Sequence, residues 1–240
     1  MLVPSSARRL TAVDLFAGCG GFSLGIIQAG LDVLAAVEWD AVAAMTYMVN
    51  LGAYPIDIRF VEEADRERFE KELTPRKKKG VVSSVPLSGS NRDPNVPGVP
   101  VFWFGDIRKI SGADVLKSIG LDVGELDLIV GGPPCQGFSI AGKQNVMDPR
   151  NSLVFEFARL ICEMRPKTLC MENVTGILSM VTEHGIPVID EFCAILERGN
   201  YGEHEALLRM LSGAKHARIA RRGKPSTKST RGDAQTCLFT

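Results

Sequence analysis

Residues 11–40, TAVDLFAGCGGFSLGIIQAGLDVLAAVEWD, decide the fold class of this chain. Residues 11–16 are a short run of β-forming residues that ends at the glycine turn of residues 17–21. Residues 22–29 have helical character, and a second apolar run follows at residues 32–37. Because a strand alternates with a helix here, we expect the two strands to lie parallel in one sheet.

The same alternation continues along the rest of the chain. Apolar runs predict further strands, and patterns of helical period predict further helices. Asp40 is expected to be the N-cap of the first of these helices. The expected strands are residues 101–104, 126–130 and 167–171, and the expected helices are residues 41–50, 113–119, 151–164 and 188–196. The predicted fold is therefore α/β, with a doubly wound parallel sheet.

The composition is that of an ordinary globular domain. The 240 residues are 45% hydrophobic and 23% charged, which excludes a chain that is disordered as a whole. No stretch contains the roughly 20 apolar residues needed to cross a membrane. The first ten residues, MLVPSSARRL, contain no apolar core of a secretory signal. We therefore expect a cytoplasmic protein with no membrane partner.

The cysteines are scattered along the chain as lone thiols. There are six of them, and none forms a CxxC pair. This spacing argues against a zinc site and against a disulfide framework. We therefore expect no metal.

Two segments depart from the α/β pattern of the main domain, residues 1–213. Residues 60–100 join a charged run to a stretch rich in Ser, Pro, Gly and Asn, and we expect a largely disordered insertion there. Its Lys77–Lys79 cluster is either a solvated loop or a phosphate contact. Residues 214–240 are a basic tail, because eight Lys or Arg and no Asp or Glu lie in residues 209–231. We expect this tail to be disordered, and it is either a contact for a polyanion or a solvated end.

The glycine turn after the first strand is typical of a nucleotide-like ligand site. Glycine lets the backbone approach a ligand closely, and the N-terminus of the following helix presents N–H groups. The spacing Gly18-x-Gly20 lacks the third glycine of a dinucleotide site, since Ser23 stands there. The turn by itself is therefore a weak signal.

Three side chains at strand ends add to this signal. Glu38 lies 24 residues after Asp14, where doubly wound folds place an acid that accepts hydrogen bonds from ribose hydroxyls. Trp39 could stack on an adenine ring, and Asp106 could accept from the exocyclic amine of adenine. Each residue also has an ordinary interpretation, as an exposed acid or a core tryptophan. Taken together with the glycine turn, they favour an adenosine-type cofactor.

One thiol is held in an unusual loop. Cys135 follows the sequence Gly131-Gly132-Pro133-Pro134 at the end of an apolar strand, where open α/β sheets place their ligands. Proline fixes φ and glycine permits close approach, so this loop is rigid and accessible. We interpret Cys135 as a nucleophile rather than as a small buried hydrophobe, and the other five cysteines as packing residues.

Six short blocks follow one another along the chain: DLFAGCGG (14–21), Glu38-Trp39, GDI (105–107), GGPPCQGFS (131–139), NSLVFEFARLI (151–161) and MENV (171–174). In this order they resemble the first six conserved blocks of the DNA (cytosine-5)-methyltransferases. The likeness covers roughly residues 11–178. Its specific part is PPCQ followed by ENV, because many methyltransferases share the first glycine turn.

The resemblance implies an enzyme that uses S-adenosyl-L-methionine to methylate a flipped-out cytosine in double-stranded DNA. It also implies the Rossmann-like sheet of the S-adenosylmethionine-dependent methyltransferases. On this template, residues 1–213 are the cofactor-binding and catalytic domain. The cofactor pocket is assigned to Phe16, Gly18, Gly20, Gly21, Glu38, Trp39, Asp106, Ile107, Pro134 and Leu153.

The resemblance also implies catalytic roles for Cys135 and Glu172. Cytosine C5 is a weak nucleophile, so the Cys135 thiolate would first add to C6. Glu172 would offset the negative charge at N3, rather than pair with an arginine as an ordinary strand-end acid. Asn173 would hold the loop geometry, and residues 136–150 would be the mobile loop that closes on the DNA.

The family's target-recognition domain has no counterpart in this sequence. Residues 217–222, ARIARR, match the family's arginine-rich block poorly, and the 24 residues from 217 to 240 are too few for a recognition domain. We therefore expect a truncated or split enzyme, incomplete at the C-terminal end of its fold, to which a second polypeptide supplies recognition. Two alternatives stay open, an RNA cytosine-5 methyltransferase and an inactive cofactor-binding remnant. A role in restriction-modification is also left open.

Overall fold

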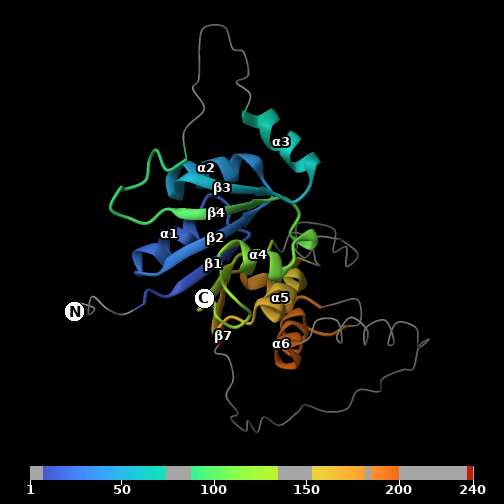
Figure 1. The fold of residues 1–240 in the computed structure, drawn as a ribbon. Coiled ribbons are helices and arrows are strands. Elements are labelled where there is room, and N and C mark those ends of the chain that lie inside the picture. Colours follow the sequence, from blue (N-terminus) through green and yellow to red (C-terminus); the bar gives the residue numbers. More distant parts are fainter. Residues whose placement is uncertain (1–7, 74–87, 135–152, 182–184, 200–236, 240) are drawn as a thin grey trace, which may run out of the picture.

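A single parallel sheet forms the centre of the protein (Figure 1). The computed structural model describes residues 8–73, 88–134, 153–181, 185–199 and 237–239. The sheet has seven strands in the order β3-β4-β2-β1-β5-β6-β7, and every neighbouring pair is parallel. The strands are β1 (Thr11–Leu15), β2 (Asp32–Glu38), β3 (Gly52–Phe60), β4 (Val99–Phe104), β5 (Leu128–Gly131), β6 (Thr168–Met171) and β7 (Cys237–Phe239).

Helices cover both faces of the sheet, so the predicted doubly wound α/β fold is confirmed. One face packs against α1 (Gly21–Gln28), α2 (Ala41–Leu51) and α3 (Glu63–Leu73). The other face packs against α4 (Gly112–Ser118), α5 (Leu153–Met164) and α6 (Val188–Arg198). The chain leaves β1 toward β2 on one side and resumes at β5 on the other. Folds of this kind bind their ligands at the carboxyl ends of the strands, near this reversal.

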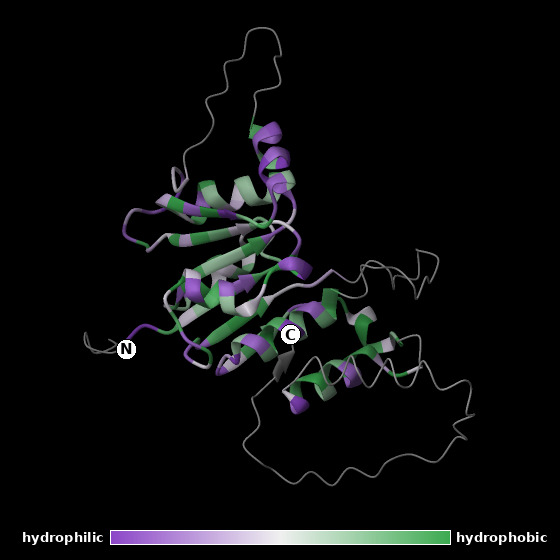
Figure 2. Cartoon of the chain, turned by 45° about the vertical axis from the view of Figure 1, so that its right-hand side comes forward, coloured by the Kyte–Doolittle hydropathy of each residue, from purple (hydrophilic) through white to green (hydrophobic). Residues whose placement is uncertain are grey.

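Alternate residues of β1 face opposite helical layers. Val13 and Leu15 are buried in the cluster with α4, α5 and α6, whereas Ala12 is buried in the cluster with α1 and α2. Because both faces of the strand are covered, β1 reads as an almost continuous apolar run. Figure 2 shows mostly hydrophobic residues along the central strands of the sheet, whereas α3 is mostly hydrophilic.

The start of α2 agrees with the sequence. The Asp40 carboxylate accepts hydrogen bonds from the backbone N–H groups of Val42 at 3.0 Å and Ala43 at 2.8 Å. These groups have no partner within the helix, so a carboxylate at this position stabilises the first turn. The predicted N-cap is confirmed.

The predicted disorder of residues 60–100 is wrong for most of the residues of this segment that the structure describes. Residues 63–73 form α3, in which only Asp65 and Phe69 are buried. A helix with so little apolar surface has no apolar stripe, and its sequence resembles a solvated loop. The edge strand β3 was also missed, because Pro55, Asp57 and Arg59 interrupt its apolar pattern.

The second half of that segment and the tail also contain structure. Backbone N–H groups of Gly89 and Asn91 donate to the carbonyls of Met48 and Val49, which fixes the turns of residues 88–98 against the end of α2. Residues 237–239 form β7, so the predicted disorder of the tail is wrong there. Residues 74–87 and 214–236 lie outside the described residues. In the described part of the chain, no helix is long and apolar enough to cross a membrane.

At the amino ends of the strands, Asp127 joins three segments. Its carboxylate accepts from the Arg8 guanidinium at 2.7 Å, from Lys167 Nζ at 2.6 Å, and from the backbone N–H and hydroxyl of Thr11 at 2.9 and 3.0 Å. Burial raises the pKa of Asp127, but the bonds from Lys167 and Thr11 and the charge of Arg8 outweigh burial and lower it to about 2. This carboxylate therefore connects the segments that lead into β1, β5 and β6.

Replacing Asp127 by Asn is expected to lower the free energy of unfolding by about 1–2 kcal/mol, because two cations lose their partner charge. The folded pKa lies below the unfolded value of about 3.9, so the stabilisation is present above about pH 4 and lost as the pH falls toward 2. Urea denaturation at about pH 6 and about pH 3 measures this effect. Equal acid sensitivity of the two proteins would contradict it.

Candidate active site

A cavity of about 510 Å³ opens at the carboxyl ends of the strands. Its walls come from the residues that follow β1, β2, β4 and β5, and from the first turn of α5. It therefore lies at the edge where doubly wound folds bind ligands. The lining residues are Phe16, Val37, Glu38, Trp39, Gly105, Asp106, Ile107, Arg108, Gly132, Pro134 and Leu153.

Seven of the ten residues predicted for the cofactor pocket line this one cavity. They are Phe16, Glu38, Trp39, Asp106, Ile107, Pro134 and Leu153. The three predicted glycines, Gly18, Gly20 and Gly21, are not among its lining residues. Gly20 and Gly21 instead line a second cavity of about 700 Å³ along α1. That these residues bind a cofactor stays a prediction.

The glycine turn is a tight backbone structure. Phe16 has a φ of +61°, Gly18 of +54° and Gly20 of +95°, all in the left-handed region. A β-carbon at Gly20 would lie 2.5 Å from Leu51 Cδ1, so only glycine fits between the turn and α2. Phe16 is not a glycine, and a left-handed phenylalanine at a cavity wall is a backbone strain of the kind that marks functional sites.

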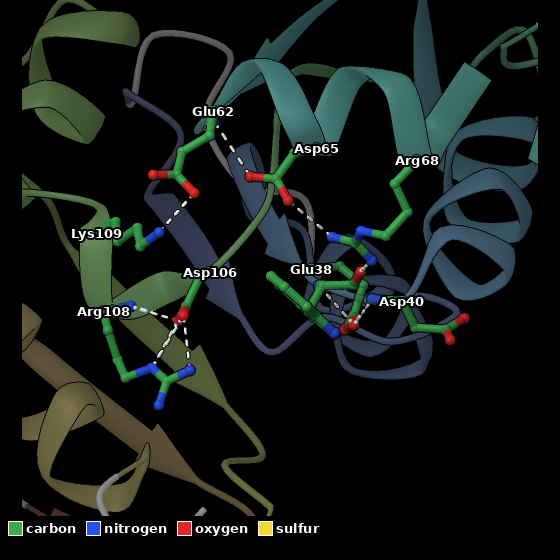
Figure 3. Close-up of polar contacts among 9 residues, drawn as sticks. Glu38, Asp40, Glu62, Asp65, Arg68, Asp106, Arg108 and Lys109 are labelled. Atoms are coloured by element: carbon green, nitrogen blue, oxygen red, sulfur yellow. Dashed lines mark hydrogen bonds and ion pairs between the residues drawn. The ribbon is translucent and has the colours of Figure 1, made fainter. Parts of the chain in front are cut away.

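Glu38 holds this turn to the end of β2. Its Oε2 accepts from the Gly18 N–H at 2.8 Å, and its Oε1 accepts from the N–H groups of Trp39 and Asp40, both at 2.7 Å. The close-up in Figure 3 shows Glu38 and Asp40 together at this turn. A carboxylate has about four acceptor positions, so acceptor capacity is left for a ligand hydroxyl.

Behind the turn lies a buried acid that the sequence analysis did not interpret. Asp14 Oδ2 accepts from the Ser23 hydroxyl at 2.6 Å and from the Ser23 N–H at 3.1 Å, and the hydroxyls of Ser23 and Tyr47 are 2.7 Å apart. Burial raises the pKa of Asp14 to about 7 despite the hydrogen bonds from Ser23, and the charge of Glu38 adds to the rise. Asp14 thus caps the first turn of α1 from the preceding strand.

Asp106 faces the cavity but already has a partner. The Arg108 guanidinium donates to both of its carboxylate oxygens, with Nε at 2.9 and 3.0 Å and Nη2 at 2.7 Å (Figure 3). Partial burial raises the pKa of Asp106, but the hydrogen bonds and charge of Arg108 and the charge of Lys109 outweigh burial and lower it. The acid is therefore ionised, and its Oδ1 also accepts from the Arg108 backbone N–H at 3.0 Å. Sequence reasoning missed Arg108, which follows the GDI block directly.

The loops after β5 and β6 are tied together beside the cavity. Asn173 Nδ2 donates to the Pro133 carbonyl at 2.9 Å, which confirms that Asn173 holds the loop geometry. A β-carbon at Gly132 would lie 3.1 Å from Glu172 Oε2, so glycine there lets the exposed Glu172 carboxylate approach the loop. In the described part of the chain, no arginine pairs with Glu172.

The predicted nucleophile, Cys135, and the predicted mobile loop, residues 136–150, lie outside the described residues. The packing interpretation of the other cysteines is wrong for Cys19, which is exposed in the glycine turn. Cys162, Cys170 and Cys193 are half-buried, and burial raises the pKa of each thiol. The side chain of Cys237 lies outside the described part. Among the described residues, no group of three or more metal-ligating side chains occurs.

The chain is similar in sequence to known DNA methylases and methyltransferases. The family described as C-5 cytosine-specific DNA methylase matches residues 10–86 and 97–212. The type II methyltransferase M.DdeI of Desulfomicrobium norvegicum is 34% identical over 174 residues, which cover 72% of this chain and 30% of that protein. The type II methyltransferase M.XorII of Xanthomonas oryzae pv. oryzae is 28% identical over 240 residues, covering 94% and 46%.

A solved structure is also similar. The crystal structure of an E. coli protein, described as a DNA modification methyltransferase encoded within a prophage, gives a TM-score of 0.49 at 26% identity. The match covers 78% of this chain and 38% of that chain. The chain thus spans less than half the length of each of these three proteins.

Replacing Asp14 by Asn is expected to remove a pH dependence of stability. The folded pKa of about 7 lies above the unfolded value of about 3.9, so the folded protein holds a proton that the unfolded chain releases. Stability from this group therefore falls as the pH rises from about 4 to about 7, by on the order of 3 kcal/mol. Asn stays neutral and can still accept from Ser23.

Urea denaturation at about pH 5 and about pH 8 distinguishes the two proteins. The unsubstituted chain should lose more stability than Asp14→Asn over this interval, and the variant should be the more stable protein at the higher pH. Asp127→Asn is the control, because Asp127 titrates below this interval. A fall of the same size in Asp14→Asn would show that another group is responsible.

Proposed function

The chain belongs to the C-5 cytosine-specific DNA methylase family, and on this basis we propose that it transfers a methyl group from S-adenosylmethionine to C5 of cytosine in double-stranded DNA. The cavity at the carboxyl edge of the sheet carries the proposal. Seven predicted cofactor residues line it, and its wall includes Pro134, the residue directly before Cys135. The proposed reacting residue therefore directly follows, in the sequence, a residue of the cavity wall.

The lining of the cavity fits an adenosyl group. Its volume of about 510 Å³ is in the usual range for small-molecule sites. Trp39 is 53% exposed and offers an aromatic face for the adenine ring. Glu38 and Asp106 supply acceptors for hydroxyl and amino groups, and Phe16 and Leu153 supply apolar surface. When bound, S-adenosylmethionine supplies an electrophilic methyl group.

Cys135 is the nucleophile of the proposed reaction. Its thiolate adds to C6 of the cytosine, which opens the C5–C6 double bond and gives C5 the electron density of an enamine. After C5 has taken the methyl group, loss of the C5 proton to a base re-forms the double bond. The thiolate leaves C6 in the same step, so the enzyme is regenerated.

Glu172 acts on the same ring. Thiolate addition at C6 places negative charge on the cytosine, and a carboxyl group at N3 offsets it by hydrogen bonding or proton donation. The bond from Asn173 to the Pro133 carbonyl supports this assignment, because it fixes the Glu172 loop relative to the loop that leads into Cys135.

The proposed substrate is a base extruded from the duplex, since C5 and C6 are not accessible to a thiol inside the stack. The names of the relatives, type II methyltransferases, support a role in restriction-modification. Supply of target recognition by a second polypeptide stays a prediction. The proposed closing loop, residues 136–150, stays a prediction as well.

Replacing Cys135 by Ser should abolish methyl transfer, with a loss of roughly 10³-fold or more, because a serine hydroxyl is far less ionised than a thiol. It should also abolish the covalent adduct on duplex DNA that contains 5-fluorocytosine, in which C5 has no proton to lose. Tritium transfer from labelled S-adenosylmethionine and gel detection of the adduct are the measurements. Cys193→Ser, at a half-buried thiol on α6, is the matched control.

The results of these measurements also distinguish the proposed function from its alternatives. An adduct formed by Cys135→Ser would show that another residue is the nucleophile. Tritium transfer into tRNA in place of duplex DNA would favour the RNA alternative. An unsubstituted chain that binds S-adenosylmethionine and forms no adduct would favour the cofactor-binding remnant.

Glu172→Gln should lower the single-turnover rate of methyl transfer by about 10²- to 10⁴-fold, because an amide cannot donate a proton to N3 as a carboxylic acid can. The affinity for S-adenosylmethionine should not change, since Glu172 does not line the cofactor cavity. Rapid-quench measurement of the methylated product tests the rate, and calorimetric titration tests the affinity. A rate within threefold of the unsubstituted chain would exclude Glu172 as the group acting at N3.

A further inference from the structure

The indole ring of Trp39 has a cation stacked on it. Arg68 Cζ lies 3.9 Å from the centre of the Trp39 ring and 4.5 Å from the centre of the Phe104 ring. Arg68 belongs to α3, the helix that the sequence patterns did not predict. Figure 3 shows its side chain reaching from α3 toward the turn at Glu38 and Asp40.

The guanidinium of Arg68 is fixed in this position. Its Nη2 donates to Asp65 Oδ1 at 3.0 Å, and its Nη1 donates to the backbone carbonyl of Trp39 at 2.5 Å. A guanidinium that is planar and bonded at two corners has a defined orientation. It therefore presents a fixed surface to the indole.

Asp65, the partner of Arg68, is itself held against the wall of the cavity. It is buried, and its Oδ2 accepts from the Glu62 N–H at 3.2 Å. A β-carbon at Gly105, where φ is +148°, would lie 2.5 Å from this oxygen. Only glycine permits that approach, and Gly105 lines the cavity directly before Asp106. The GDI block thus also provides the docking point for α3.

We propose that Arg68 is a positioning residue of the cofactor site. By stacking on the indole, it holds Trp39 in the orientation that presents the exposed part of the ring to the adenine of S-adenosylmethionine. This inference rests on the proposed function. An exposed tryptophan without such a contact samples several rotamers, and a ligand that stacks on it must restrict them. When Arg68 stacks on the indole, the Trp39 side chain is already ordered before S-adenosylmethionine binds.

The same helix supplies a matched control. Arg66 Cζ lies 4.7 Å from the centre of the Phe60 ring, and Arg66 pairs with Glu63 at 3.4 Å. Phe60 does not line the cavity. Arg66→Ala therefore removes the same charge and the same kind of stacking from α3 without touching Trp39.

The experiment uses the full chain with Trp103→Phe, which leaves Trp39 as the single tryptophan of the sequence. Three variants are compared in this background: Arg68→Ala, Arg68→Lys and Arg66→Ala. Calorimetric titration gives the Kd for S-adenosylmethionine. Fluorescence anisotropy and acrylamide quenching report the order and exposure of Trp39 in the ligand-free protein, and thermal unfolding shows that each variant is folded.

Arg68→Ala is expected to raise the Kd by about 5- to 10-fold, the size of one cation–π contact. It should also lower the anisotropy of Trp39 and increase its quenching. Arg68→Lys keeps the charge but loses the planar guanidinium, so its Kd should lie between that of the parent and that of Arg68→Ala. The Kd and the anisotropy of Arg66→Ala should match those of the parent. Unchanged affinity and anisotropy in folded Arg68→Ala would overturn the inference alone. Absence of binding by the parent chain would overturn the proposed function, and the inference with it.

Discussion

Three backbone N–H groups converge on the carboxylate of Glu38, and the candidate site depends on this convergence. One oxygen accepts from Gly18 in the turn after β1, and the other accepts from Trp39 and Asp40 after β2. The carboxylate therefore fixes the left-handed turn, the backbone that carries the indole, and the residue that caps α2. Loss of this acceptor would leave the half-buried N–H of Gly18 without a partner, which costs more than the bond itself contributes.

The parts of the fold and site that could be predicted are those encoded locally. The buried strands read as apolar runs because helices cover both faces, and the residues that matter follow those strands directly. Glu38, Trp39 and Asp106 could be assigned to one cavity from their positions at strand ends, and they line it together. The assignment of Cys135 rests on its loop sequence and on resemblance, since this residue lies outside the described part of the chain.

The parts that could not be predicted depend on contacts between distant segments. Helix α3 has almost no apolar surface, so its sequence does not indicate that it packs against the sheet. Its place is fixed by Asp65 against the backbone of Gly105 and by Arg68 against Trp39. The raised pKa of Asp14 likewise comes from burial beneath α1, which no local pattern shows. Arg108 was missed because it belongs to no recognised motif. Its role comes only from its contact with Asp106, which was predicted.

We propose that the cavity between Trp39 and Asp106 is the cofactor site. A crystal structure of the chain with S-adenosylhomocysteine tests it most directly, because the protein has a second and larger cavity along α1. We expect the adenine to lie against the Trp39 ring, the ribose hydroxyls to lie within hydrogen-bond distance of Glu38, and Arg68 to stay on the indole as in the ligand-free protein. Density for the ligand in the α1 cavity, or an adenine that does not contact Trp39, would contradict it.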